Sequence, residues 1–211
     1  MSTMNKPESQ VSARRGRPLS FDRDAALGRA MRLFWAHGYE ATSIADLTAA
    51  MGITPPSLYA AYGDKKRLFL AAVDLYRAGT GAGAVASDQM IDAAPTAADA
   101  ARQMLDGSAV HFTGTDTPPG CLLATGAISC SAAADDVQTA VASIRLGVEA
   151  RLRDKILADI ASGIIPQDID AEILAAYIMA MIQGMSTLAR DGASRQKLQT
   201  LASAVMRGWP A

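Results

Sequence analysis

Residues 43–69 read SIADLTAAMGITPPSLYAAYGDKKRLF, and this stretch decides how the N-terminal part of the chain folds. Ser43 and Asp46 are spaced as in a capping box, in which each residue satisfies a backbone N–H group of the other at the start of a helix. The apolar side chains that follow recur at helical spacing and are Ile44, Leu47 and Met51. Gly52 suits the position just after a helix, so the pattern predicts a short helix over 44–51.

A second short helix is predicted directly after the first. Thr54 can cap it, and Pro55 suits its first turn, where a missing N–H group costs nothing. The helix is expected to run to about Tyr62, and Gly63 ends it. Two short helices joined by a glycine turn, with an earlier helix to pack on, are typical of a helix-turn-helix whose second helix enters the major groove of DNA. Helical hairpins without a DNA role share this pattern, so the pattern alone leaves both interpretations open.

Helices on both sides of this pair complete the predicted domain. Asp22 can cap a helix that Gly38 ends, and Asp64 can cap a helix that follows the pair. The expected core residues at helical spacing are Phe34, Leu47, Leu58 and Leu68. Residues 1–20 are polar and include a basic segment broken by glycine and proline, which predicts a disordered arm before a domain over 21–70.

Further helices are predicted through residues 71–211, so we expect an all-α fold with a larger helical domain after the helix-turn-helix. Glycine-rich residues 79–83 are interpreted as a hinge, because no strand precedes them and they lack the spacing and lysine of a phosphate-binding loop. Caps and apolar spacing predict helices at about 96–112, 121–130, 135–162, 170–191 and 194–209. Alanine, the best helix former, is abundant, and alternating β-branched runs are absent.

Composition excludes several classes of protein. Among 211 residues there are two cysteines, Cys121 and Cys130, which are too few for a disulfide-stapled secreted scaffold. The first ten residues lack the apolar segment of a signal peptide. The longest apolar run, residues 173–182, has half of the roughly 20 residues that a membrane span needs. We therefore expect a soluble, cytoplasmic protein with no membrane partner.

Charge is distributed unevenly along the chain. The formal net charge of −1 argues against a general nucleic-acid binder when the chain is taken whole. Residues 1–70, however, carry ten Lys and Arg against six Asp and Glu, a net of +4, and the remainder carries ten against fifteen, a net of −5. The basic excess therefore lies on the predicted DNA-binding part.

Residues 16–69 resemble the N-terminal DNA-binding domain of the TetR/AcrR family of transcriptional regulators. The resemblance rests on the order and spacing of three segments, which are residues 33–44 (LFWAHGYEATSI), 51–59 (MGITPPSLY) and 62–69 (YGDKKRLF). Residues 80–211 match the family in architecture only. That architecture implies helices around an effector cavity and a last pair of helices that binds a second copy.

The resemblance also implies which residues contact a double-stranded DNA operator. Base edges would face Thr54, Pro55, Ser57 and Ala60. The DNA backbone would be contacted by Thr42 or Ser43, Tyr59, Tyr62 and Lys65. Arg17 in the arm would lie in or near the minor groove. Family members often have His or another polar residue where Ala61 stands, so base recognition here is expected to rely less on hydrogen bonds and more on DNA shape.

For the C-terminal part we expect an effector cavity and a homodimer interface. The candidate cavity residues are Met104, His111, Cys121, Tyr177 and Met181. The candidate interface residues on the last two helices are Met179, Met181, Ile182, Gly184, Met185 and Leu201. Each interface residue could instead belong to the core of a single chain.

Together these patterns predict a ligand-responsive homodimeric regulator, a repressor that a small-molecule or electrophilic effector releases from a palindromic operator. Cys121 is a candidate sensor, because a thiol at a helix N-terminus tends to have a lowered pKa, and simple packing is the alternative. Two other functions stay open: a helical thiol-dependent redox enzyme that uses Cys121, and an architectural DNA-binding protein that does not switch. The sequence has no evident metal-ligand set, catalytic pair or cofactor motif, so we expect neither an enzyme nor a cofactor.

Overall fold

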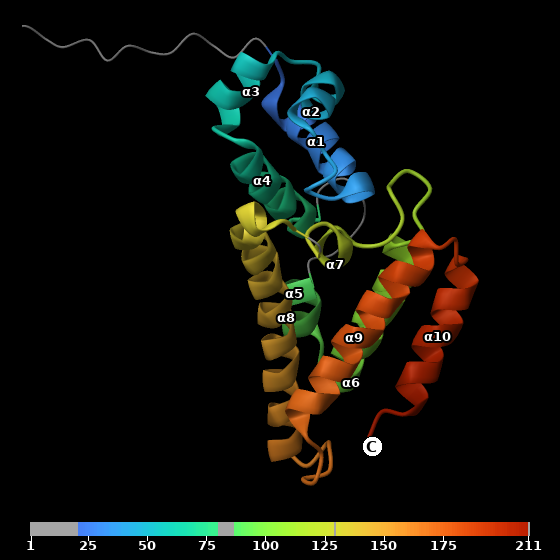
Figure 1. Cartoon of the computed structure of the whole chain (residues 1–211). Coiled ribbons are helices and arrows are strands. Elements are labelled where there is room, and N and C mark those ends of the chain that lie inside the picture. The colour runs from blue at the N-terminus through green and yellow to red at the C-terminus, as the bar shows by residue number, and fades with distance from the viewer. Residues whose placement is uncertain (1–20, 80–86, 129, 211) are drawn as a thin grey trace, which may run out of the picture.

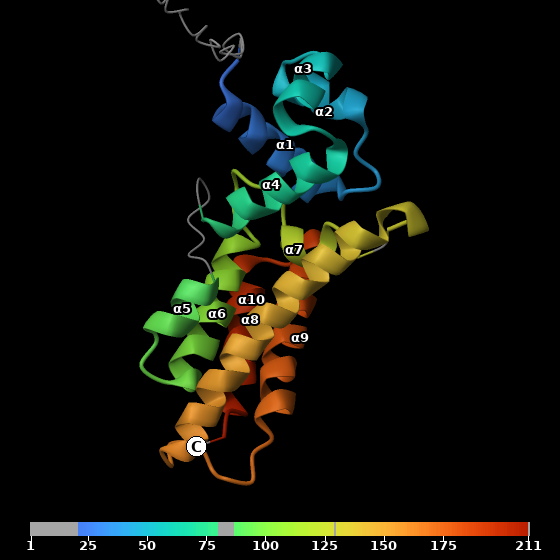
Figure 2. The ribbon, with the colours of Figure 1, turned by 90° about the vertical axis from the view of Figure 1, so that its left-hand side faces the viewer.

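The computed structural model describes residues 21–79, 87–128 and 130–210, and these residues form helices without any strand (Figure 1). A head of four helices lies at one end of an elongated molecule, and a body of mostly longer helices forms the rest (Figure 2). The predicted all-α fold is confirmed. The predicted arm at residues 1–20 and residues 80–83 of the predicted hinge lie outside the described residues.

The head contains the helices that the capping residues predicted. Its helices are α1 (Arg23–His37), α2 (Ile44–Met51), α3 (Pro55–Tyr62) and α4 (Lys65–Arg77). A cap side chain accepts a hydrogen bond from the first turn of each helix, and the caps are Asp22, Ser43, Thr54 and Asp64. Ser43 and Asp46 form the complete capping box. Such caps matter most for α2 and α3, because a helix of eight residues is marginal on its own in water.

The body is built around the long helices α8 and α9. Its elements are α5 (Ser87–Ala93), α6 (Ala97–His111), α7 (Leu122–Thr125), the 3₁₀ turn η1 (Ala132–Ala134), α8 (Asp135–Ala161), α9 (Ala171–Arg190) and α10 (Arg195–Arg207). Asp170 and Ser194 cap α9 and α10 as predicted. α9 contacts α6, α7, α8 and α10, so it lies at the centre of the body.

The core of the head extends into the body. Phe34, Leu47, Leu58 and Leu68 are fully buried, as expected. The same core includes body residues from α7 and from the start of α8, among them Leu122, Val137 and Val141. Head and body are therefore packed together at α7 and at the first turns of α8. α4 also runs unbroken through the predicted domain boundary at residues 70 and 71.

Two body elements differ from the sequence-based prediction. The helix expected over 121–130 ends at Thr125, because the chain turns there and the Gly126 carbonyl accepts a hydrogen bond from the backbone N–H of Tyr39 (2.8 Å). α5 was not predicted. It has seven residues and one large buried apolar side chain, Ile91. A single buried residue cannot show the periodic spacing by which a helix is recognised in the sequence.

Among the described helices, α9 is the one that could cross a membrane by its length and composition. One side of α9 packs against the other body helices. Large apolar side chains on its other side are exposed, and they include Ile173 and Tyr177.

Candidate DNA-binding surface and effector cavity

The turn between α2 and α3 depends on Gly52. Its φ of 69° and ψ of 34° lie in the left-handed region, which residues with a Cβ adopt rarely. Its backbone N–H donates to Ala49 O (3.3 Å), and the N–H of Ile53 donates to Thr48 O (3.1 Å), so two carbonyls at the end of α2 are satisfied. This turn sets the direction in which α3 leaves α2.

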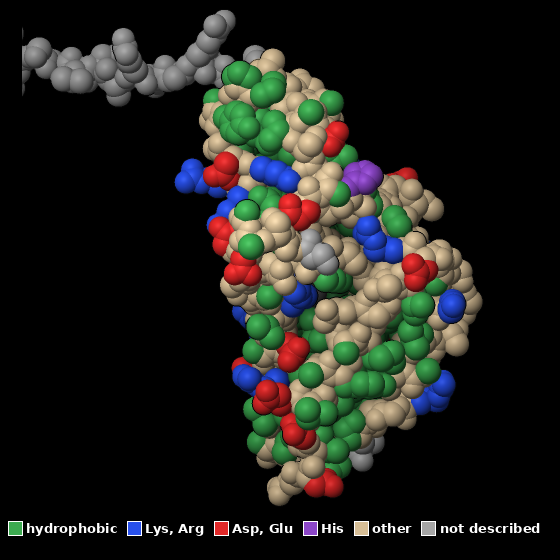
Figure 3. Space-filling model, viewed as in Figure 1, with side chains coloured by type: hydrophobic (Ala, Val, Ile, Leu, Met, Phe, Trp, Pro, Cys, Tyr) green, Lys and Arg blue, Asp and Glu red, His purple; other side chains and the backbone are tan. Residues whose placement is uncertain are grey.

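α3 presents a small, mostly apolar surface. Leu58 is fully buried and anchors the helix in the head core, whereas Tyr59 is 49% exposed. The other exposed residues of the helix are Pro55, Pro56 and Ala60. Hydrophobic side chains accordingly gather over α3 in the space-filling view (Figure 3). Of the predicted base-facing residues, Thr54, Pro55 and Ala60 are exposed and Ser57 is half-buried.

Two arginines of α1 hold the C-terminal ends of α2 and α3. Arg29 Nη2 donates to Met51 O (3.0 Å), and Arg23 Nη2 donates to Ala61 O (2.9 Å). Cations suit these carbonyls, because the C-terminus of a helix carries partial negative charge. These arginines are part of the basic excess counted in the sequence, and their carbonyl contacts are structural roles that the sequence pattern did not indicate.

The side chains of two predicted backbone contacts are engaged inside the head. Thr42 is 1% exposed and its hydroxyl donates to Gly38 O (2.6 Å). Tyr62 is 7% exposed and its hydroxyl donates to Arg23 O (2.9 Å). The expectation that these hydroxyls are presented to DNA is therefore corrected. Ser43, the alternative to Thr42, is exposed and caps α2.

Lys65 and Lys66 begin α4 and differ in their partners. Lys65 Nζ lies 4.4 Å from the centroid of the Tyr39 ring, a cation–π contact, and burial lowers the pKa of this lysine. Lys66 forms an ion pair with Asp136 at the start of α8. Lys65 thus packs on an aromatic ring of the head, whereas Lys66 joins the head to the body. Arg17, the predicted minor-groove residue, lies outside the described residues.

A cavity of about 790 Å³ lies in the body below the head. Its lining comes from every body helix and from the end of α4, and it includes Met104, His111 and Cys121, as predicted. Tyr177 and Met181, the other two candidate cavity residues, are not among its lining residues. The α9 residues that face the cavity are Met179, Ile182 and Gln183. The helical period of α9 was recognised in the sequence, but which of its faces meets the cavity depends on packing.

One wall of the cavity is a hydrogen-bonded group of three side chains. The Tyr76 hydroxyl donates to Cys121 Sγ (3.3 Å) and lies 2.9 Å from His111 Nε2. Burial raises the pKa of Tyr76 well above its usual value, and burial also raises the pKa of the Cys121 thiol. The expectation of a lowered thiol pKa at a helix N-terminus is therefore wrong. α7 has only four residues, and loss of water outweighs the hydrogen bonds that its amides give the sulfur.

Trp35 connects this wall to the head. Its indole ring stacks on His111 with centroids 5.1 Å apart and meets the Tyr76 ring edge-on at 5.0 Å. The indole N–H donates to Gly120 O (3.0 Å), the residue just before Cys121. Arg190 of α9 donates to the Trp35 carbonyl (3.1 Å), so the end of α1 is held by the cavity wall and by the body.

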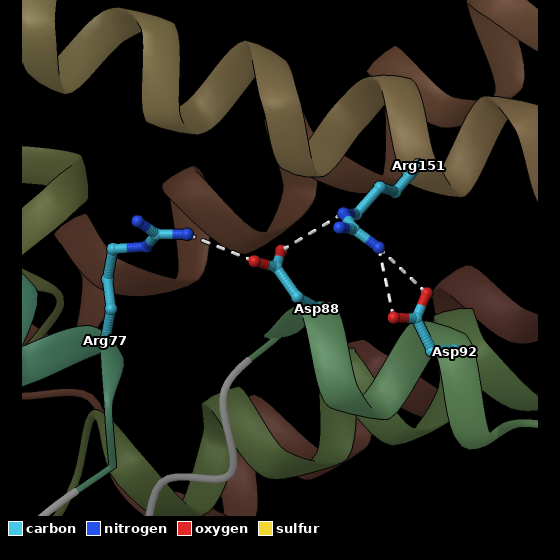
Figure 4. Close-up of polar contacts among 4 residues, drawn as sticks. All are labelled: Arg77, Asp88, Asp92 and Arg151. Atoms are coloured by element: carbon cyan, nitrogen blue, oxygen red, sulfur yellow. Dashed lines mark hydrogen bonds and ion pairs between the residues drawn. The ribbon is translucent and has the colours of Figure 1, made fainter.

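Ion pairs at the edge of the cavity join α4, α5 and α8 (Figure 4). Arg77 Nη2 lies 3.0 Å from Asp88 Oδ2, and both residues line the cavity. Arg151 of α8 lies 4.0 Å from Asp88 Oδ1 and 3.0 Å from Asp92 Oδ1. These partly exposed pairs add little stability, but they tie the end of α4 to the body. No group of three or more potential metal ligands occurs among the described residues.

Comparisons with known proteins agree with both halves of this architecture. The family model of bacterial regulatory proteins of the tetR family matches residues 26–72, and that of the tetracyclin repressor-like C-terminal domain matches residues 97–205. The chain is 40% identical over 200 residues to the HTH-type transcriptional repressor ComR of Escherichia coli K12, covering 95% of this chain and 94% of ComR. It is 30% identical to the repressor BdcR of the same organism, covering 97% and 95% of the two chains.

A solved structure of a regulator on DNA is also similar. A cysteine variant of the TetR family regulator CifR, in complex with a 26-base-pair double-stranded operator, superposes with a TM-score of 0.85 at 36% identity. The match covers 92% of this chain and all of the CifR chain. With both family models matched and relatives similar over nearly its whole length, the chain belongs to the TetR family of DNA-binding transcriptional regulators.

Proposed function

We propose that this protein is a cytoplasmic, homodimeric repressor that leaves a palindromic operator when a small molecule fills the cavity of the body. The observation that carries the proposal is the course of α4. It begins with Lys65 beside the α3 surface and ends with Tyr76 and Arg77 in the cavity wall. A helix of 13 residues is about 20 Å long and moves as a rigid rod, so a displacement at the cavity end is passed to the DNA-binding end.

The proposed DNA contacts are exposed and half-buried residues of the head together with Arg17 of the arm. Base edges face Thr54, Pro55, Ser57 and Ala60, as the resemblance implies. Phosphates are met by Ser43, the Tyr59 hydroxyl and Lys65, and Arg17 enters or flanks the minor groove. A dimer with two such heads suits a palindromic operator whose half-sites lie about 34–36 Å, or a multiple of that spacing, apart.

Transmission from cavity to head runs through Trp35 as well as through α4. An effector that displaces His111 or Tyr76 removes the stacking support of the indole ring at the end of α1. α1 holds the ends of α2 and α3 through Arg29 and Arg23, so its movement reaches the recognition helix. An effector that prefers the displaced arrangement weakens operator binding by its difference in affinity for the two states.

The cavity favours a non-covalent effector over an electrophile. Apolar side chains such as Met104, Val148 and Ile182 line it together with polar groups at Tyr76, His111 and Gln183. Charged side chains, among them Arg77, Asp88 and Arg145, complete the lining, and such a mixture of apolar and polar groups suits a small molecule. Cys121 also faces this space, but its raised pKa leaves little thiolate at neutral pH, and thiolate is the nucleophilic form. The same property disfavours the alternative of a thiol-dependent redox enzyme.

Homodimerisation is proposed through the exposed sides of α9 and α10. Hydrophobic side chains gather over α9 in Figure 3, and Ile173 is 65% exposed and Tyr177 45% exposed. Gly184 is exposed and has open space around it, so a second helix can approach closely. Met179 and Met185 are buried within the chain, which corrects their expected place at the interface.

The test is a pair of linked binding measurements. An operator is selected from random duplexes by the purified protein, and a small-molecule library is screened for compounds that raise its melting temperature. A stabilising compound should weaken operator binding, and operator DNA should weaken binding of that compound by the same factor. The variant Ile182→Trp, which narrows the cavity, should bind the operator but lose the thermal response. A compound that binds in the cavity and leaves operator affinity unchanged would contradict the switch and favour the non-switching DNA-binding protein.

A further inference from the structure

The recognition helix α3 carries no side chain that forms paired hydrogen bonds with a base. Its sequence, PPSLYAAY, contains no Arg, Lys, Asn, Gln, Asp, Glu or His. Arg and Lys recognise guanine, Asn and Gln recognise adenine, and Asp and Glu recognise cytosine through such contacts in the major groove. Direct recognition from α3 therefore depends on another kind of contact.

The hydroxyl groups near the start of α3 are partly engaged within the protein. Thr54 Oγ1 lies 3.0 Å from Ser57 Oγ, so the two hydroxyls share a hydrogen bond. The same Thr54 oxygen accepts from the backbone N–H of Ser57, as the cap of the helix. Outside these two residues, the exposed surface of the helix consists of the rings of Pro55 and Pro56, the methyl group of Ala60 and the phenol of Tyr59.

The major groove offers one apolar group that this surface fits, the C5-methyl group of thymine. Apolar side chains placed against the amino group of cytosine or the O6 of guanine would instead leave a polar group without water or a partner, which is unfavourable. We propose that α3 reads the C5-methyl groups of pyrimidines through Ala60, Pro55 and Pro56. This inference rests on the proposed entry of α3 into the major groove and names the base chemistry that the helix recognises there.

The test removes single methyl groups from the DNA. In the selected operator, each thymine is replaced in turn by deoxyuridine, which keeps all hydrogen-bonding groups and base pairing. Loss of one buried methyl should weaken binding about fourfold at the positions under α3, and thymines outside the footprint should show no change. At the same positions, a 5-methylcytosine–guanine pair should bind more tightly than an unmethylated cytosine–guanine pair.

Variants of the helix assign the contact. Ala60→Gly and Pro56→Ala each remove apolar surface, and circular dichroism establishes that α3 and the head remain folded. In each variant, the deoxyuridine penalty should vanish at one position per half-site and persist at the others. Ala60→Ser keeps the size of the side chain and serves as a second variant if glycine unfolds the helix.

Two results would overturn the inference. Equal affinity for thymine and deoxyuridine at every position of a bound operator would show that α3 does not read methyl groups, while the proposed regulatory function would stand. A deoxyuridine penalty that remains unchanged in all three variants would assign the methyl contacts to another part of the protein. Failure of the wild-type protein to select any duplex would overturn the proposed function itself and this inference with it.

Discussion

Lys65 occupies the first turn of α4, where a positive charge is opposed by the positive end of the helix dipole. Burial lowers the pKa of this lysine, and the Tyr39 ring below Nζ offsets part of the loss of water. A phosphate beside the ammonium group would relieve both unfavourable effects. In the proposed complex, a DNA phosphate would be the anionic partner of this lysine.

We expect Lys65→Ala to weaken operator binding by about three- to tenfold and to reduce the salt dependence of binding by about one counterion per subunit, because one phosphate contact is lost. Fluorescence anisotropy over a range of salt concentrations measures both quantities. Lys155→Ala, a half-buried lysine on α8 like Lys65 in its exposure, is the matched control and should change neither. An unchanged salt slope for Lys65→Ala would assign this lysine to the fold of the head.

The chemistry of Cys121 is also decided at the residue scale. Because burial raises its pKa, we expect iodoacetamide to modify Cys121 at least tenfold more slowly in the folded protein than in urea at the same pH. The rate in the folded protein should continue to rise above pH 9. Mass spectrometry of the Cys130→Ser variant follows this one thiol. Equal rates in the folded and unfolded states would favour Cys121 as a sensor of electrophiles.

At the scale of the elements, a residue far away in the sequence helps to stabilise the start of α6. Thr96 caps it locally, and the buried carboxylate of Asp159 on α8 accepts a second hydrogen bond from the Ala97 N–H (2.7 Å). The backbone carbonyl of Asp159 also accepts from Ile164 N (2.9 Å), so this one residue organises the start of α6 and the end of α8.

Asp159→Ala should lower the free energy of unfolding by about 1–3 kcal/mol, because it leaves a buried N–H group without its acceptor. Urea denaturation followed by circular dichroism measures the change. Asp154→Ala is the control, since its exposed carboxylate pairs only with the neighbouring Arg153 among the described contacts. Equal losses of stability in the two variants would argue against a special role for the Asp159 contact.

The helices of the head were predictable because each signal was local. Caps lie next to the helices that they start, and Gly52 and Gly63 directly follow α2 and α3. α5 and the end of α7 were not predictable in this way. α5 has too few apolar positions to show a period, and α7 ends where a carbonyl is taken by Tyr39 of the head. This contact joins residues 87 positions apart in the chain, so it cannot be recognised from the sequence around either residue.

At the scale of the whole molecule, the exposed apolar side of α9 predicts that two copies of the chain form a dimer. Tyr177→Glu should convert the proposed dimer to a monomer, because it places a charge in the surface that the proposed interface buries. Analytical ultracentrifugation measures the mass, and operator affinity should fall at least tenfold, since one head holds only one half-site. Leu146→Glu on α8 is a control of similar exposure. Dissociation by the control but not by Tyr177→Glu would place the interface elsewhere.

How the head packs on the body also decides whether a change in one part can reach the other. Trp35 belongs to α1 by sequence, yet its ring lies against His111 and Tyr76 in the wall of the body cavity. The sequence around Trp35 does not indicate this contact with the body. In the proposed switch, the packing of α1 on the cavity wall passes the effect of a ligand in the body to the DNA-binding surface of the head.

The sequence by itself determined the fold class, the helix-turn-helix and the chemistry of α3, because caps, glycine turns and helical spacing act within a few residues. Only the tertiary structure decided that Thr42 and Tyr62 face inward, that Tyr177 and Met181 are not among the lining residues of the cavity, and that burial raises the pKa of the Cys121 thiol. Helical spacing shows which residues share a face, but not which neighbour covers it. The pKa of a thiol depends on how much water its surroundings exclude, and distant segments of the chain decide that.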